Sequence, residues 1–204
     1  MNSLNFKELL KNVYSDVGLA EAKTRRALLS EQMYDNEKKG LDCMNCTGRC
    51  CTYEANSMQM TSIEALEAMA ALEEKGLLNQ ETRRRLEDCI SEFRLDKYIQ
   101  IGAGEFFRKS YTCPFYFYPS FGCGLGVDHK PYGCIAFNPC EPGQSEGGNC
   151  QSDLDIQEKR NLQFEESEDL ADKYLFEKFD ISPLKEPIPI KLLEIWRKVY
   201  SEKL

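Results

Sequence analysis

Four of the ten cysteines in this 204-residue chain fall within nine residues, in the segment Cys43-Met44-Asn45-Cys46-Thr47-Gly48-Arg49-Cys50-Cys51. The spacing is Cys-x2-Cys-x3-Cys-Cys, and a Cys-x2-Cys turn can bring two thiolates to one centre. Thiolates are soft ligands that suit zinc, copper(I) and iron–sulfur clusters. Asn45 and Gly48 are residue types that tolerate the tight turns of such a loop. The segment therefore indicates a metal site, with a group of reduced, buried thiols as the alternative.

The neighbouring pair Cys50-Cys51 adds a geometric constraint. Adjacent side chains diverge by about 100° on a helix and point to opposite faces of a strand. Two adjacent sulfurs therefore do not naturally converge on one small ion. Either they serve two centres, or one is a ligand and the other lies beside the ligands, and the sequence leaves both arrangements open.

A second group of cysteines lies between Ile101 and Cys150, where glycine, proline and aromatic residues replace helical periodicity. This segment has too little regular backbone to fold alone, so we expect metal ligation to hold it. We expect residues 113–140 to close onto residues 43–51 and to form one site region with them. The aromatic residues of this segment either pack over the site region or belong to the hydrophobic core, which is the more frequent role for such rings; they are Phe106, Phe107, Tyr111, Phe115, Tyr116, Phe117, Tyr118 and Phe121.

Two further residues have metal-binding side chains. His129 is the only histidine and lies between cysteines, so it is either a ligand or a hydrogen-bonded loop residue. Cys89 falls on the apolar face of a predicted helix, beside Leu86 and Ile90, where a free cysteine acts as a small hydrophobic residue. Cys89 is therefore left out of the predicted site.

Several short motifs occur together between residues 41 and 140. They are Cys43-x2-Cys46-x3-Cys50-Cys51, Thr61 and Glu64 at a helix start, Cys113-Pro114-Phe115, Gly122-Cys123, Lys130-Pro131-Tyr132-Gly133-Cys134, and Phe137-Asn138-Pro139-Cys140. With this set of motifs the chain resembles the YkgJ-like family of cysteine-cluster proteins, which are described as zinc- or iron-chelating. The resemblance covers about half of the chain and leaves out the flanking helices.

The resemblance implies eight metal ligands and leaves Cys150 outside the set. These ligands are Cys43, Cys46, Cys50, Cys51, Cys113, Cys123, Cys134 and Cys140. Members of the family are commonly labelled iron–sulfur oxidoreductases, so the resemblance also implies a redox or electron-transfer role. Whether this chain is itself an enzyme stays open.

An all-cysteine ligand set suits either an iron–sulfur cluster or zinc. The number of sulfurs, the aromatic residues around them and the resemblance favour an iron–sulfur cluster. The alternative is a non-enzymatic module in which zinc staples the loops and the helices bind a partner. The expected partner is accordingly an unidentified protein or redox partner.

Composition narrows the other classes of partner. The net charge of −8 and the pI near 4.9 argue against general binding to nucleic acid or to anionic membranes, which attract cationic patches. No run of about 18 apolar residues would span a membrane. The first residues lack the apolar stretch of a signal peptide. Ten cysteines without an export signal favour a reducing compartment, so we expect a cytoplasmic protein.

Around the cysteines, apolar residues recur at helical spacing, and the predicted fold is mainly α, with helices around an irregular, cysteine-rich metal-binding loop region. The predicted parts are an N-terminal helical segment (residues 1–40), a cysteine-cluster metal-binding domain (41–150) and a C-terminal helical segment that packs on the rest (151–204). Helices are expected over residues 6–17, 19–39, 62–76, 80–98 and 153–180, with a closing helix before the end. Thr61 and Glu64 form a capping-box pattern.

Overall fold

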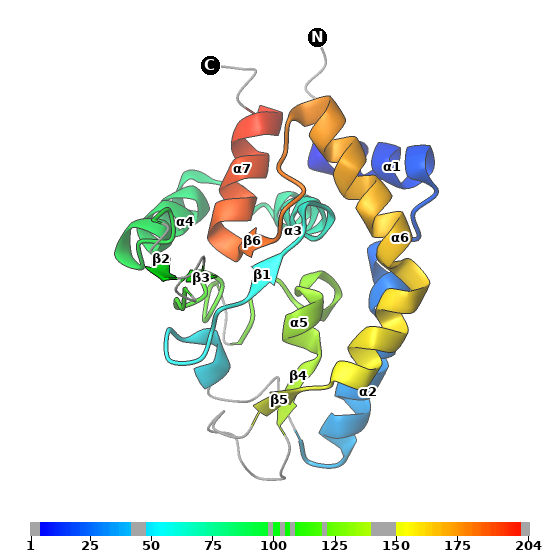
Figure 1. Ribbon diagram of the computed structural model, residues 1–204, viewed down its shortest axis with the longest axis vertical. Helices are drawn as coiled ribbons and strands as arrows, with labels where there is room; N and C mark the ends of the chain where they lie inside the picture. The colour runs from blue at the N-terminus through cyan, green and yellow to red at the C-terminus, as the bar shows by residue number, and fades with distance from the viewer. Residues whose placement is uncertain are drawn as a thin grey trace.

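The computed structural model describes residues 5–41, 48–97, 100–102, 105–106, 109–119, 122–139 and 150–200, and these are mainly helical, as predicted (Figure 1). The α-helices are α1 (Phe6–Val17), α2 (Ala22–Lys38), α3 (Ser62–Glu74), α4 (Gln80–Glu92), α5 (Tyr132–Ile135), α6 (Leu154–Phe179) and α7 (Ile188–Tyr200). Short 3-10 helices are η1 (Arg49–Cys51) and η2 (Val127–His129). Antiparallel pairs join β1 (Gln59–Met60) to β6 (Glu186–Pro187), β2 (Gln100–Gly102) to β3 (Glu105–Phe106), and β4 (Phe137–Pro139) to β5 (Cys150–Ser152).

Helix α3 lies at the centre of the core, because its residues are small or apolar on almost every side. Its buried residues run without a break from Ser62 to Leu72. The predicted capping box is confirmed: Thr61 Oγ1 accepts the N–H of Glu64, and the Glu64 carboxylate accepts the N–H of Thr61. Helices α1, α6 and α7 pack against α3.

The N-terminal helices follow the predicted pattern closely. Helix α1 buries Phe6, Leu9 and Val13, so its apolar stripe packs in the core. The helix ends at Gly18, which adopts a left-handed conformation with φ of 65°. Helix α2 then runs to Lys38 and lies beside α6 (Figure 1).

The C-terminal segment packs along most of the other helices. Helix α6 is capped by Asp153, whose side chain accepts the N–H of Ile156, and it contacts α1, α2 and α3. Helix α7 packs on α3 and α4, and the ring of Tyr200 at its end stacks on Phe6. None of the helices in the described ranges is long and apolar enough to cross a membrane.

Helix α4 ends at Glu92, so the predicted end at Tyr98 is wrong by six residues. The chain leaves the helix at Arg94, which has a φ of 50°, and the N–H of Leu95 returns to the carbonyl of Ile90 at 3.0 Å. A left-handed residue at a helix end is usually glycine or asparagine. Arginine at this position gives no such signal, so the sequence pattern alone does not mark the end of the helix.

Candidate metal centre

Five described cysteines from the two groups line one cavity of about 60 Å³. Those on its wall are Cys50, Cys51, Cys113, Cys123 and Cys134. None of the five forms a disulfide, and all are half-buried. For the members that the structure describes, the second group therefore closes onto the first, as predicted. The adjacent Cys50 and Cys51 both face the cavity, although the sequence left their relation open.

Backbone hydrogen bonds clamp the two cysteine segments together. The N–H of Cys113 donates to the carbonyl of Cys51 at 2.7 Å, and the N–H of Tyr111 donates to the carbonyl of Asn56 at 2.9 Å. Beside this clamp, the Arg85 guanidinium donates to the carbonyl of Pro114. The cavity walls are thus joined by paired polar groups of the main chain, as the interior of a protein requires.

Helix α5 carries Cys134 and is held from two sides. The backbone N–H of Tyr132 donates to Oε1 of Glu64 at 2.7 Å. Just before α5, the carbonyl of Lys130 accepts a hydrogen bond from Nε of Arg26 at 3.0 Å. The start of α5 is therefore tied to both α3 and α2, and this fixes the position of the cysteine two residues further on.

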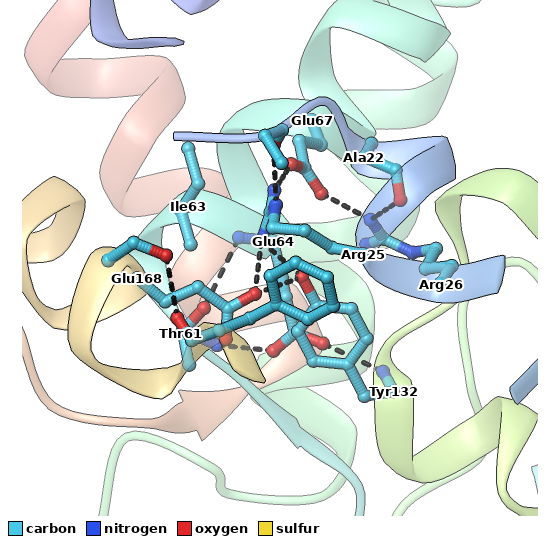
Figure 2. A network of polar contacts seen from close by, with 12 residues as sticks. Ala22, Arg25, Arg26, Thr61, Ile63, Glu64, Glu67, Tyr132 and Glu168 are labelled. Atoms are coloured by element: carbon cyan, nitrogen blue, oxygen red, sulfur yellow. Dashed lines mark hydrogen bonds and ion pairs between the residues drawn. The ribbon is translucent and has the colours of Figure 1, made fainter. Parts of the chain in front are cut away.

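A buried ionic network lies against α5, and Figure 2 shows its members converging between α2, α3, α5 and α6. Arg25 pairs with both Glu67 and Glu168, and Arg26 pairs with Glu67 at 2.5 Å. Both arginines and Glu67 are fully buried. The Tyr132 hydroxyl donates to Glu168 at 2.5 Å.

The same network places a third guanidinium against Tyr132. Arg160 of α6 lies with its guanidinium carbon 3.4 Å from the centre of the Tyr132 ring and pairs with Glu168. Burial raises the pKa of Glu168, but the hydrogen bond and charge of Arg160 outweigh it and hold the pKa below its ordinary value. Glu168 is therefore ionised and balances the cations around it.

The thiols of the cavity differ in acidity. The pKa of Cys50 is lowered to about 7, mainly by a hydrogen bond with the Cys51 thiol; burial opposes this effect and the Lys130 ammonium adds to it. The same hydrogen bond, together with burial, raises the pKa of Cys51. Burial also raises the pKa of Cys113 and Cys134. Of these four, Cys50 is the most readily ionised, and the thiolate is the form that binds metal.

The remaining candidates lie away from the described wall of the cavity. Cys89 is buried on α4, and its thiol donates to the carbonyl of Thr112 at 3.4 Å. Burial raises the pKa of Cys89 to about 12, which keeps the thiol protonated. Neither Cys150, in β5, nor His129, in η2, is among the described residues that line the cavity.

Three predicted ligands, Cys43, Cys46 and Cys140, lie outside the described residues. Within the described part of the chain, no three His, Cys, Asp or Glu side chains form a group that could hold a metal ion. The structure therefore shows five cysteines on one cavity wall, and the complete set of eight metal ligands stays a prediction.

Comparisons with protein-family models, curated proteins and solved structures found no match for this chain. The resemblance to the YkgJ-like family therefore stays a prediction from the cysteine motifs. The function of the chain has to be argued from the cavity and the residues around it.

Several residues that build this site give no signal in the sequence. Arg25, Arg26 and Arg160 resemble ordinary helix-surface arginines, and only the fold buries them. The run Arg83-Arg84-Arg85 is a short basic stretch of the kind that is usually solvated. Arg83 and Arg84 do pair with carboxylates on their own helix, but Arg85 reaches the cysteine segment.

The aromatic shell is smaller than predicted in the part that the structure describes. Tyr116 lines the cavity, whereas Tyr111 and Phe115 belong to the hydrophobic core and Phe117 is exposed. Tyr118 lies under the Arg85 guanidinium, 4.2 Å from its carbon to the ring centre. The side chains of Phe106, Phe107 and Phe121 are outside the described residues.

Proposed function

We propose that this chain is a metal-binding protein whose cysteines ligate a centre in the cavity, with an iron–sulfur cluster favoured over zinc. The observation that carries the proposal is that five thiols, from segments separated by about 60 residues, line one small cavity. Soft sulfur ligands from two segments are the typical holders of zinc and iron–sulfur centres. The helices of the fold would then surround a cysteine-rich metal-binding loop region.

The size of the cavity separates an inorganic occupant from an organic substrate. Sites for small organic molecules usually have volumes of about 300–1,000 Å³. The cysteine cavity measures about 60 Å³, which is room for roughly four or five water molecules. That volume suits an ion or a small cluster and is too small for a typical organic ligand.

The residues present fit such a centre in their chemistry. The potential donor atoms are cysteine sulfurs. Apolar side chains such as Met58, Leu125 and Ile188 complete the wall, and Lys130 also lines it. A cluster would supply one-electron redox chemistry when bound. The predicted holders are Cys50, Cys51, Cys113, Cys123 and Cys134 of the described residues, together with Cys43, Cys46 and Cys140.

The ten cysteines of the chain also favour a reducing compartment, so the location that we propose is the cytoplasm. An electron-transfer role would require a redox partner protein. The motifs that resemble the YkgJ-like family support this proposal but do not name a substrate.

The proposal is tested by metal and sulfide analysis of the chain purified without oxygen. Roughly four irons with matching sulfide per chain, and a brown colour, would support a [4Fe–4S] centre. One or two zinc ions in a colourless protein would favour the zinc alternative. Protein that carries neither metal, and that takes up neither on reconstitution, would refute the proposal.

A zinc-stapled interaction module is the second candidate, and one surface feature favours it. Helix α6 exposes large apolar side chains, with Leu154 at 71 %, Leu162 at 82 % and Leu170 at 50 % exposure. These leucines are eight residues apart, so they are separate apolar points on the helix that a protein partner could cover. In this reading zinc would hold the loops, and α6 would bind the partner.

A further inference from the structure

Asn56 is a buried side chain, 5 % exposed, on the wall of the cysteine cavity. Its backbone N–H donates to the carbonyl of Thr52 at 2.8 Å, and its carbonyl accepts the N–H of Tyr111. Its side-chain Oδ1 accepts the N–H of Met58 at 3.0 Å. That last bond fixes the orientation of the carboxamide, because an NH2 group in the same place could not accept it.

The remaining polar group of Asn56, the Nδ2 amide, is buried and has no hydrogen-bond partner in the described part of the chain. Buried donors in folded proteins are almost always paired. Because Asn56 lines the cavity, an occupant of the cavity is a candidate acceptor for this donor. The wall around it holds five cysteine sulfurs, which become strong acceptors once ionised.

A positively charged side chain on the same wall also favours an anionic occupant of the cavity. Lys130 is only 7 % exposed and lines the cavity. Cys50 and Cys134 lie on the same wall as this lysine. A metal ion held by several thiolates carries net negative charge, so a cation and an N–H donor in its wall would both stabilise it.

We propose that the Asn56 carboxamide donates a hydrogen bond to a thiolate-ligated metal centre in this cavity and so sets its metal affinity and electronic character. The inference rests on the proposed function, since it needs a centre to be present. An N–H···S bond withdraws electron density from the sulfur, which stabilises the thiolate and lowers the energy of its lone pairs. Asn56 acts through the ligands and is therefore a positioning residue.

The test uses cobalt(II) as a spectroscopic probe on the full chain without oxygen. In Asn56→Asp the Oδ1 acceptor for Met58 is kept and the donor is replaced by an oxygen. We expect unchanged cobalt stoichiometry, an affinity about tenfold lower by competition with a chelator, and a sulfur-to-cobalt absorption band at longer wavelength. Asn56→Ala removes the donor without adding a carboxyl group and should shift the band in the same direction.

Thr82→Val is the matched control, because Thr82 Oγ1 is also buried and without a partner in the described residues but lies on α4, off the cavity wall. This variant should bind cobalt like the wild type, with the band unmoved. If both Asn56 variants keep the cobalt affinity and the band position of the wild type, the inference is overturned. The proposed function would still stand. A shift of equal size in Thr82→Val would also overturn the inference. A wild-type chain that binds no cobalt, iron or zinc would overturn the proposed function itself.

Discussion

The carboxylate of Glu64 is shared between two elements: its Oε2 accepts the N–H of Thr61 at 2.9 Å, and its Oε1 accepts the N–H of Tyr132 at 2.7 Å. One side chain thus closes the first turn of α3 and holds the start of α5. Because Cys134 follows Tyr132 by two residues, the cap of the core helix also positions a wall of the cysteine cavity.

Glu64→Gln should therefore cost more than the loss of an ordinary cap. An amide is neutral and has only one acceptor oxygen, so one of the two buried N–H groups loses its acceptor and the other keeps only a neutral one, at a cost of about 2–3 kcal/mol in the free energy of unfolding. Asn79→Ala, which removes the cap of α4 alone, should cost about 1 kcal/mol. Urea unfolding measures both, and equal losses would show that the bond to Tyr132 contributes nothing.

Asp172 makes stability depend on pH. It is 6 % exposed, and burial raises its pKa to about 7, although the N–H of Ile63 donates to it at 2.8 Å and lowers the pKa. Glu64 and Glu168 nearby raise the pKa, and Lys191 lowers it. The folded state therefore holds a proton that the unfolded state loses near pH 4, and stability falls as the pH rises from about 4 to 7.

Asp172→Asn keeps an acceptor for the Ile63 N–H and removes the titration. The stability of the variant relative to the wild type should rise by about 2–3 kcal/mol between roughly pH 5 and pH 8, because one pKa unit corresponds to about 1.4 kcal/mol. Urea unfolding of both proteins at several pH values measures this difference. Parallel pH profiles would contradict the prediction.

Gly48, the glycine of the first cysteine segment, should be hard to replace. Its φ is 72°, and a Cβ atom there would lie 2.5 Å from Cε2 of Tyr116 on the cavity wall. Gly18 has a similar φ of 65°, but a Cβ atom added there would have no neighbouring atom within 4 Å. Gly18→Ala should then show the backbone cost alone, about 1–2 kcal/mol, and Gly48→Ala a larger loss in thermal or urea unfolding. Similar losses would mean that the Tyr116 ring moves aside freely.

Removing the carboxylate that serves both buried arginines should strongly destabilise the fold. Glu67→Gln leaves Arg25 and Arg26 without the charge that they share, and an unbalanced buried charge costs about 3–5 kcal/mol. Glu74→Gln breaks an exposed pair with Lys7 and should cost at most about 1 kcal/mol. The free energy of unfolding of the two variants measures the contrast, which a loss under about 1 kcal/mol for Glu67→Gln would disprove.

The cysteines should divide into two classes by metal content. Cys134→Ser, on the cavity wall, should lower bound metal and stability, because binding energy at cysteine sites is folding energy. Cys89→Ala should keep full metal and lose only about 1 kcal/mol of packing. Cys150 lies off the described wall and should also be dispensable for metal. The metal content of the purified variants measures this difference. A loss of bound metal on replacing Cys89 or Cys150 would refute the division into two classes.

Local signals in the sequence predict the elements that obey local rules. The capping box at Thr61 and Glu64, the end of α1 at Gly18 and the cap of α6 at Asp153 all depend on residues a few positions apart. The juxtaposition of the two cysteine groups is also predictable, because neither segment has enough regular backbone to stand alone.

Other features could not be predicted from the sequence, and most of them depend on contacts between residues that are far apart in the chain. Arg25 and Arg26 are buried only because carboxylates from α3 and α6 meet them, and no spacing on α2 shows this. Asn56 looks like any loop asparagine until the fold seals its amide on the cavity wall. The end of α4 escapes prediction because Arg94 adopts a conformation that its residue type rarely takes.

Ile188 lies on the wall of the cysteine cavity, and the N–H of Ile188 donates to the hydroxyl of Tyr111. Gly48, on the same wall, is 140 residues earlier in the chain (188 − 48). At a translation rate of about 5–20 residues per second, roughly 7–28 seconds separate the synthesis of these two positions. The wall around Cys50 and Cys51 is thus complete only after the segment with Ile188 has been made and has folded back onto it.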